Sequence, residues 1–212
     1  MAENGYFYVP NIISYVRLLL VLLSWFYWRN PPWFLGFYLT SLFLDGINGT
    51  VARKLHQTSA FGVWLDLVID NVGRGMIWSQ LYKWGCFVSA FEWCVLVCTH
   101  TAGAQWKSNY GQAPWLVKNV ITNDFKTPVG LYTVWSLQLL PLWLFAYRSG
   151  FLTAHIPVGV VYFVISILSV GRAMCAAVEL YCIWAHIQQM ISSDISQKSL
   201  LREEKDQKPD LV

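Results

Sequence analysis

Six apolar runs, separated by short polar connections, constrain the fold of this chain more than any other feature. Their expected limits are residues 12–28, 33–54, 61–83, 87–104, 129–147 and 158–187. A helix of about twenty apolar residues crosses the hydrocarbon core of a bilayer. A helix also satisfies its own backbone hydrogen bonds, which lipid cannot do. We therefore predict an all-α, polytopic membrane protein, built as a bundle of six transmembrane helices.

The composition agrees with a membrane protein and excludes several other classes. Of the 212 residues, 56% are hydrophobic and 13% are charged, against about 25% charged in a typical soluble domain. The net charge of +3 is modest, so we expect the lipid bilayer as a partner and no nucleic acid. Five Cys without C-x-x-C or Cys/His spacing argue against a disulfide framework or a zinc site.

The chain divides into a membrane domain, residues 1–187, and a polar tail, residues 188–212, which we expect to be mobile. Six spans place both termini on one side of the membrane. Nine basic residues flank the spans on that side: Arg53, Lys54, Lys107, Lys118, Lys126, Lys198, Arg202, Lys205 and Lys208. Three lie on the other side: Arg29, Lys83 and Arg148. This asymmetry predicts cytoplasmic termini.

Three carboxylates lie in the second and third apolar runs, at Asp45, Asp66 and Asp70. An ionisable residue inside a membrane segment is costly and indicates a functional site. Asp45 and Asn48 are three apart, and Asp66 and Asp70 are four apart, so each pair shares one helix face. If the two faces meet, their oxygens suit a hard cation such as Mg2+ or Mn2+. Separate roles as helix caps or private ion pairs would explain one such carboxylate better than three.

Other charged residues inside the runs allow more than one interpretation. Arg17 either extends to the membrane interface or points inward to an anionic group. Glu92 and His100 are eight residues apart, and we interpret them as a structural polar pair. Arg172 and Glu179 are seven apart, or two helical turns, and we expect them to face the bundle interior.

Residues 45–70 resemble the signature of the CDP-alcohol phosphatidyltransferases, D-x2-D-G-x2-A-R-x8-G-x3-D-x3-D. In this chain the signature positions are Asp45, Asn48, Gly49, Ala52, Arg53, Gly62, Asp66 and Asp70. Every spacing fits without a gap, and one position departs, because Asn48 stands where the family has its second Asp. Residues 9–17, VPNIISYVR, also resemble the VPN-x3-Y-x-R opening of eukaryotic phosphatidylinositol synthases.

The resemblance implies a displacement of CMP from CDP-diacylglycerol by a hydroxyl of myo-inositol, which gives phosphatidylinositol. Two divalent cations, Mg2+ or Mn2+, would be held by Asp45, Asn48, Asp66 and Asp70. Asp70 would also be the general base. The expected substrate-binding residues are Gly49, Arg53, Gly62, Lys118 and Lys126. The resemblance further implies a homodimer in the endoplasmic reticulum membrane.

Asn48 keeps a second hypothesis open. An amide oxygen binds a cation more weakly than a carboxylate does, and the alternative hypothesis is therefore a weakened or inactive paralogue that binds nucleotide, lipid or an active relative. A third alternative is the same chemistry with another acceptor alcohol.

Overall fold

The computed structural model describes residues 7–101, 113–123 and 125–207. Its regular elements are helices: α1 (Val9–Phe26), α2 (Pro31–Lys54), α3 (Ala60–Leu81), α4 (Gly85–Thr101), α5 (Trp115–Ile121), α6 (Pro128–Arg148) and α7 (Val158–Gln207). Each of the six long helices covers one of the six apolar runs to within three residues, except that α7 continues twenty residues past the last run. The predicted all-α class is therefore confirmed.

Three of the described helices are long and apolar enough to cross a membrane. These are α1, α6 and the part of α7 from Val158 to Leu200. Residues Gly85–His100 of α4 form a shorter apolar helix. Helices α2 and α3 contain the charged residues of the signature, and this lowers their hydropathy. Length and composition thus support a membrane-spanning chain.

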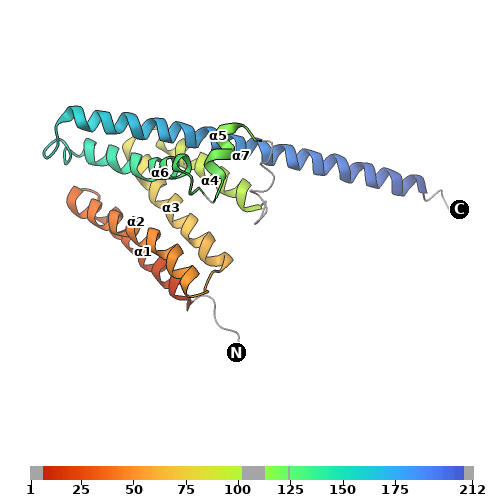
Figure 1. Ribbon diagram of the computed structural model, residues 1–212, viewed down its shortest axis with the longest axis horizontal. Helices are drawn as coiled ribbons and strands as arrows, with labels where there is room; N and C mark the ends of the chain where they lie inside the picture. The colour runs from red at the N-terminus through yellow and green to blue at the C-terminus, as the bar shows by residue number, and fades with distance from the viewer. Residues whose placement is uncertain (1–6, 102–112, 124, 208–212) are drawn as a thin grey trace.

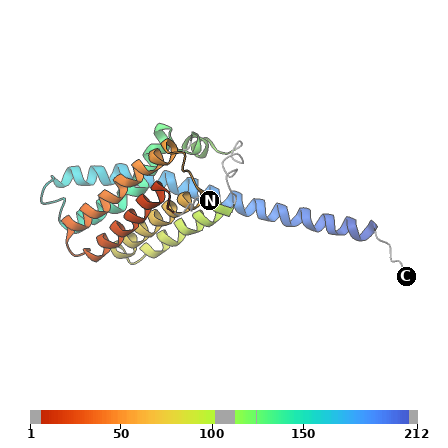
Figure 2. The ribbon, with the colours of Figure 1, turned by 90° about the horizontal axis from the view of Figure 1, so that it is seen from below.

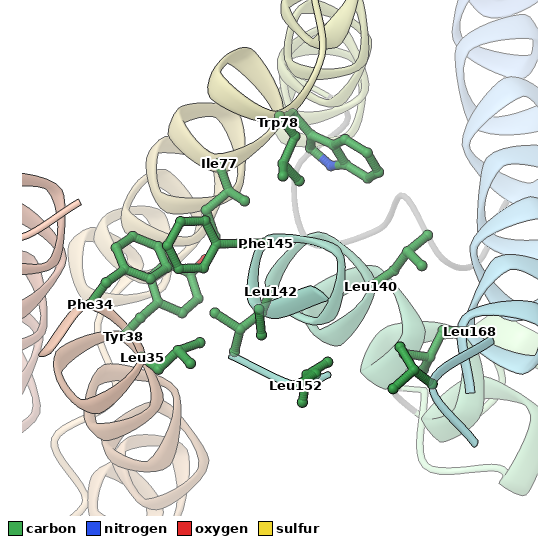
Figure 3. Close-up of a cluster of buried hydrophobic side chains, with 13 residues drawn as sticks. Phe34, Leu35, Tyr38, Ile77, Trp78, Leu140, Leu142, Phe145, Leu152 and Leu168 are labelled. Carbon is green, nitrogen blue, oxygen red and sulfur yellow. The ribbon is translucent and has the colours of Figure 1, made fainter. Parts of the chain in front are cut away.

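The long helices pack side by side, as Figures 1 and 2 show. Helix α1 packs mainly against α2 and α3, and α6 packs against α7. The largest apolar cluster joins α2, α3, α6 and α7, and Figure 3 shows Phe34 and Tyr38 of α2 grouped near Phe145 of α6. The rings of Phe34 and Phe145 have centroids 4.1 Å apart. This aromatic packing holds α2 against α6 and thereby fixes the helix that contributes Asp45.

The start of α3 is defined by a cap and by a close contact with α1. Ser59 Oγ accepts a hydrogen bond from the Gly62 backbone N–H at 3.0 Å, which satisfies one of the free N–H groups of the first turn. A Cβ at Gly62 would stand 2.5 Å from Asn11 Oδ1 of α1. The glycine therefore lets α3 approach α1 closely, and this brings Asp66 to the same level as the middle of α1.

Helix α7 has 50 residues and extends well beyond the rest of the bundle (Figures 1 and 2). The polar tail expected from residue 188 continues α7 as helix up to Gln207. Residues 172–208 contain neither Gly nor Pro, and Gln, Lys, Leu, Arg and Glu favour helix. The polar connection expected over 105–128 contains α5, while its residues 105–112 lie outside the described part of the chain.

Candidate active site

Arg17 is the centre of the candidate site. Its Nη1 lies 2.7 Å from Asp45 Oδ1 and 2.7 Å from Asp66 Oδ1, and its Nη2 lies 2.6 Å from Asp70 Oδ1. The residue is completely buried, at 0% exposure. Of the two interpretations of Arg17, the inward one is therefore confirmed. The three carboxylates converge from α2 and α3 onto a single guanidinium of α1.

Of the three signature carboxylates, Asp66 accepts hydrogen bonds from the largest number of side chains. Ser14 Oγ donates to Asp66 Oδ1 at 2.6 Å, in addition to the bond from Arg17. Asn48 Nδ2 lies 3.1 Å from Oδ1 and 3.0 Å from Oδ2 of the same carboxylate. Asn48 is buried, and its Oδ1 has no hydrogen-bond partner. The face of α2 predicted from the spacing of Asp45 and Asn48 thus meets the predicted face of α3.

Asp70 is oriented by a residue that the sequence did not single out. Gln138 Nε2 of α6 donates to Asp70 Oδ2 at 2.8 Å, and Arg74 Nη1 stands 4.0 Å from the same oxygen. Gln138 is itself buried. One signal was available, because an amide in the middle of an apolar run needs a buried partner.

A second group of buried charges continues from Arg74 into α4 and α7. Arg74 Nε lies 2.8 Å from Glu92 Oε2, and Arg172 Nη2 lies 3.3 Å from Glu92 Oε1. Arg172 Nη1 in turn lies 2.8 Å from Glu179 Oε2. The expected Glu92–His100 pair is wrong, since the Glu92 carboxylate binds two arginines and His100 is exposed. A fully charged guanidinium is the stronger partner for a buried carboxylate.

The Arg172–Glu179 pair confirms that these two residues face the bundle interior. Arg74 Nη2 also donates a short hydrogen bond to Asn71 Oδ1. The buried polar region therefore extends from α2 through α1, α3 and α4 to α7, well beyond the limits of the signature. Only its first half could be located from the spacing of residues 45–70.

The remaining predicted substrate residues lie near the surface. Arg53 is exposed, and its Nη1 would stand 3.5 Å from a Cβ on Gly49. Gly62 packs against Asn11, as described above. Lys118 and Lys126 are exposed, and α5, which carries Lys118, packs against α6 and α7. The structure thus groups Arg53 with Gly49 and does not place the two lysines in the carboxylate cluster.

The comparison with protein families identifies the class. The family model described as CDP-alcohol phosphatidyltransferase matches residues 7–162, which include every signature position and the Arg17 segment. The chain belongs to the CDP-alcohol phosphatidyltransferase family.

Individual relatives carry the name CDP-diacylglycerol–inositol 3-phosphatidyltransferase. The chain is 39% identical over 97 residues to the CDP-diacylglycerol–inositol 3-phosphatidyltransferase of Saccharomyces cerevisiae, covering 44% of this chain and 41% of the relative. It is 46% identical over 69 residues to that of Schizosaccharomyces pombe, covering 32% and 29%. It is 38% identical over 70 residues to that of Homo sapiens, covering 32% and 33%. These alignments span less than half the length of each relative. No solved structure matches the chain significantly.

Members of this family generally use divalent metal ions. The donor chemistry fits such an ion, because carboxylate and amide oxygens are hard ligands and Asn48 Oδ1 is buried without a partner. The positions of the side chains fit a metal ion less well than their chemistry does. Among the described residues, no group of three or more His, Cys, Asp or Glu is placed to hold a metal, since Arg17 lies between the three carboxylates.

Proposed function

We propose that this protein is a membrane phosphatidyltransferase that makes phosphatidylinositol and CMP from CDP-diacylglycerol and myo-inositol. The observation that carries the proposal is the convergence of Asp45, Asp66 and Asp70 of the signature on Arg17 of the N-terminal motif. Two sequence motifs that are separated in the chain thus form one site. The printed names of the relatives supply the choice of inositol as acceptor.

The proposed reaction is an attack of an inositol hydroxyl oxygen on the phosphorus that carries the diacylglycerol. The bond from this phosphorus to the CMP oxygen breaks, and CMP leaves with that electron pair. Asp70 accepts the hydroxyl proton, and Gln138, which donates to its Oδ2 at 2.8 Å, holds the carboxylate in place.

The proposed ions are Mg2+ or Mn2+, which when bound neutralise the diphosphate charge and stabilise the leaving oxygen. By the family resemblance, their ligands would be Asp45, Asn48, Asp66 and Asp70. Gly49 and Gly62 would border the nucleotide, and Arg53 would steady a phosphate. Lys118 and Lys126 would help to bind the acceptor alcohol.

The proposed setting is the endoplasmic reticulum membrane, crossed six times by α1, α2, α3, α4, α6 and α7. The beginning of α1 and the extension of α7 lie toward the same end of the bundle (Figure 1), and the asymmetry of basic residues supports a cytoplasmic location for that end. The protein would act there as a homodimer.

The test is CMP release by the purified protein in lipid nanodiscs with CDP-diacylglycerol, myo-inositol and Mn2+. We expect turnover by the wild type, none by Asp70→Ala, and wild-type turnover by Asp194→Asn, whose residue is exposed on the α7 extension. Glycerol 3-phosphate and serine replace inositol in parallel reactions. Turnover with one of these instead of inositol would reassign the acceptor, and silence with all three would exclude the proposal.

A second candidate is an inactive paralogue that binds nucleotide, lipid or an active relative. The hydrogen bonds from Asn48 Nδ2 to Asp66 favour it. They engage both carboxylate oxygens of Asp66, which the family resemblance assigns to a metal. It predicts a silent wild type and an Asn48→Asp variant that gains CMP release.

A further inference from the structure

A cavity of about 380 Å³ opens at the end of the bundle where α1 ends and α2 begins. Figures 1 and 2 show that the connection between α6 and α7 lies toward this same end, away from the start of α1 and the end of α7. The residues that line the cavity include Trp28, Arg29, Gln80, Leu81, Phe145 and Arg148. Its volume is in the range of small-molecule sites.

This cavity is separate from the candidate active site. Leu81, which lines it, follows Asp70 by eleven residues on α3, and eleven residues of helix measure about 16 Å. Residues of the largest apolar cluster, such as Tyr38 of α2 and Ile77 of α3, lie between the signature positions and the cavity (Figure 3). A ligand in the cavity would therefore be bound apart from the carboxylates on Arg17.

Two arginines determine the chemistry of the cavity. Arg29 follows α1 and Arg148 is the last residue of α6. Neither forms an ion pair with a carboxylate in the part of the chain that the structure describes. The connections at this end contain three Lys or Arg residues and no Asp or Glu, and they span 27–33, 79–87 and 146–158. Guanidinium groups without a carboxylate partner suit a phosphate, which they bind by charge-assisted hydrogen bonds.

The other walls of the cavity are partly apolar and well packed. The rings of Trp28 and Phe145 have centroids 4.5 Å apart, and both side chains line the cavity. Arg148 Cζ lies 6.0 Å from the centroid of the Tyr82 ring, and this cation–π contact helps to orient the guanidinium. Gln80 adds an amide that can donate a hydrogen bond. The cavity thus offers a cationic side and an apolar side to one ligand.

The level of the cavity in the bundle favours a lipid over a soluble anion. Helices α1 and α6 are both long and apolar enough to cross a membrane, and the cavity lies where both helices end. Phe26, Trp33 and Trp84 are exposed at this end, and aromatic side chains of membrane proteins gather at the membrane–water interface. The phosphate groups of lipids lie at this same level.

We propose that this cavity binds the phosphate group of an anionic membrane phospholipid, with Arg29 and Arg148 as the groups that hold it. Trp28 and Phe145 contact the apolar part of the same lipid. A zwitterionic choline lipid is a poorer ligand, because its own cation would face two guanidinium groups. The inference does not rest on the proposed function, since the cavity and the carboxylate cluster are separate.

The test is lipid binding to the purified full chain, followed by native mass spectrometry from dodecyl maltoside micelles. The probes are dioctanoyl phosphatidylglycerol, dioctanoyl phosphatidylcholine and inorganic phosphate, each titrated separately. We expect the wild type to bind phosphatidylglycerol more tightly than either of the others. Arg29→Gln and Arg148→Gln should each weaken this binding about tenfold or more, because each removes a charged hydrogen-bond donor.

The matched control is Lys83→Gln, which removes a positive charge at the same end from an exposed residue outside the cavity lining. It should change phosphatidylglycerol binding by less than about twofold. Unchanged binding in both arginine variants, an equal loss in Lys83→Gln, or equal binding of the two lipids by the wild type would each overturn the inference. Inorganic phosphate bound as tightly as phosphatidylglycerol would overturn the choice of a lipid and assign the cavity to a soluble phosphate. If Arg148→Gln loses helix content by circular dichroism, Arg29→Gln decides alone, because Arg29 is exposed and lies outside the helices.

Discussion

Arg74 of α3 and Glu92 of α4 form an ion pair in the interior of the bundle, with Nε and Oε2 2.8 Å apart. Their side chains are 6% and 2% exposed. The pair lies between Asp70, 4.0 Å from Arg74, and Arg172 of α7. It therefore connects the signature carboxylates to a helix that the signature does not include.

Removal of the Glu92 carboxylate should destabilise the fold. Glu92→Ala leaves the buried guanidinium of Arg74 without its main partner, and breaking a buried pair from one side costs about 3–5 kcal/mol. We expect a loss of this size in the free energy of unfolding, measured by denaturant titration in mixed micelles. Asp194→Ala, on the exposed part of α7, should change it by less than about 0.5 kcal/mol. A Glu92→Ala variant of wild-type stability would show that the pair contributes nothing net.

Gln138 should affect turnover more than substrate affinity. Gln138→Leu removes the hydrogen bond to Asp70 Oδ2, and a hydrogen bond to a charged group contributes about 1.5–3 kcal/mol. We expect kcat for CMP release to fall about ten- to a hundredfold, with little change in KM for inositol. The matched control is Gln80→Leu, at an exposed position near the end of α3, which should keep its kcat. A change confined to KM would assign Gln138 to acceptor binding instead.

Two glycines of α7 should respond in opposite ways to the same substitution. A Cβ at Gly171 would overlap Ser136 Oγ and stand 2.6 Å from Ser136 Cβ of α6, whereas a Cβ at Gly159 meets nothing within 4 Å. Gly171→Ala should therefore lower the free energy of unfolding by about 1–3 kcal/mol through overpacking. Gly159→Ala should leave it unchanged or raise it by up to about 1 kcal/mol. Equal effects of the two changes in thermal unfolding would contradict this account of the α6–α7 interface.

The extension of α7 beyond residue 190 should be dispensable for stability and for CMP release. Residues 189–200 are exposed along their whole length, so they contribute little buried apolar area. We expect a chain that ends at residue 190 to keep its thermal unfolding midpoint and its CMP release in nanodiscs. A drop in either would show that the extension supports the bundle, for example through a second copy of the chain.

The spacing of the charged residues predicted which of them share a helix face, because helical periodicity acts locally. Asp66 and Asp70 share a face by their separation of four residues, and the same rule places Asn48 with Asp45. Arg17 remained ambiguous, since a helix of known periodicity does not show which neighbour its face meets. The structure resolves this through the packing of α1 against α2 and α3.

The contacts between helices that are distant in the chain could not be predicted from the sequence. Gln138 and Asp70 are 68 positions apart, and Glu92 and Arg172 are 80 apart, so no periodic pattern links them. The incorrect Glu92–His100 pair came from applying the helix rule within α4 alone. The helix over residues 188–207 was also not predicted, because a polar and charged composition does not distinguish an exposed helix from an irregular tail.

The unbroken course of α7 sets a length scale for the whole molecule. Fifty residues of helix measure about 75 Å at 1.5 Å per residue, more than twice the roughly 30 Å of a hydrocarbon core. In the proposed membrane orientation, the end of α7 near Gln207 therefore projects tens of ångströms from the headgroups. The same orientation predicts that a fluorophore at that end reports on the aqueous phase and that one near Val158 reports on the opposite face of the bilayer.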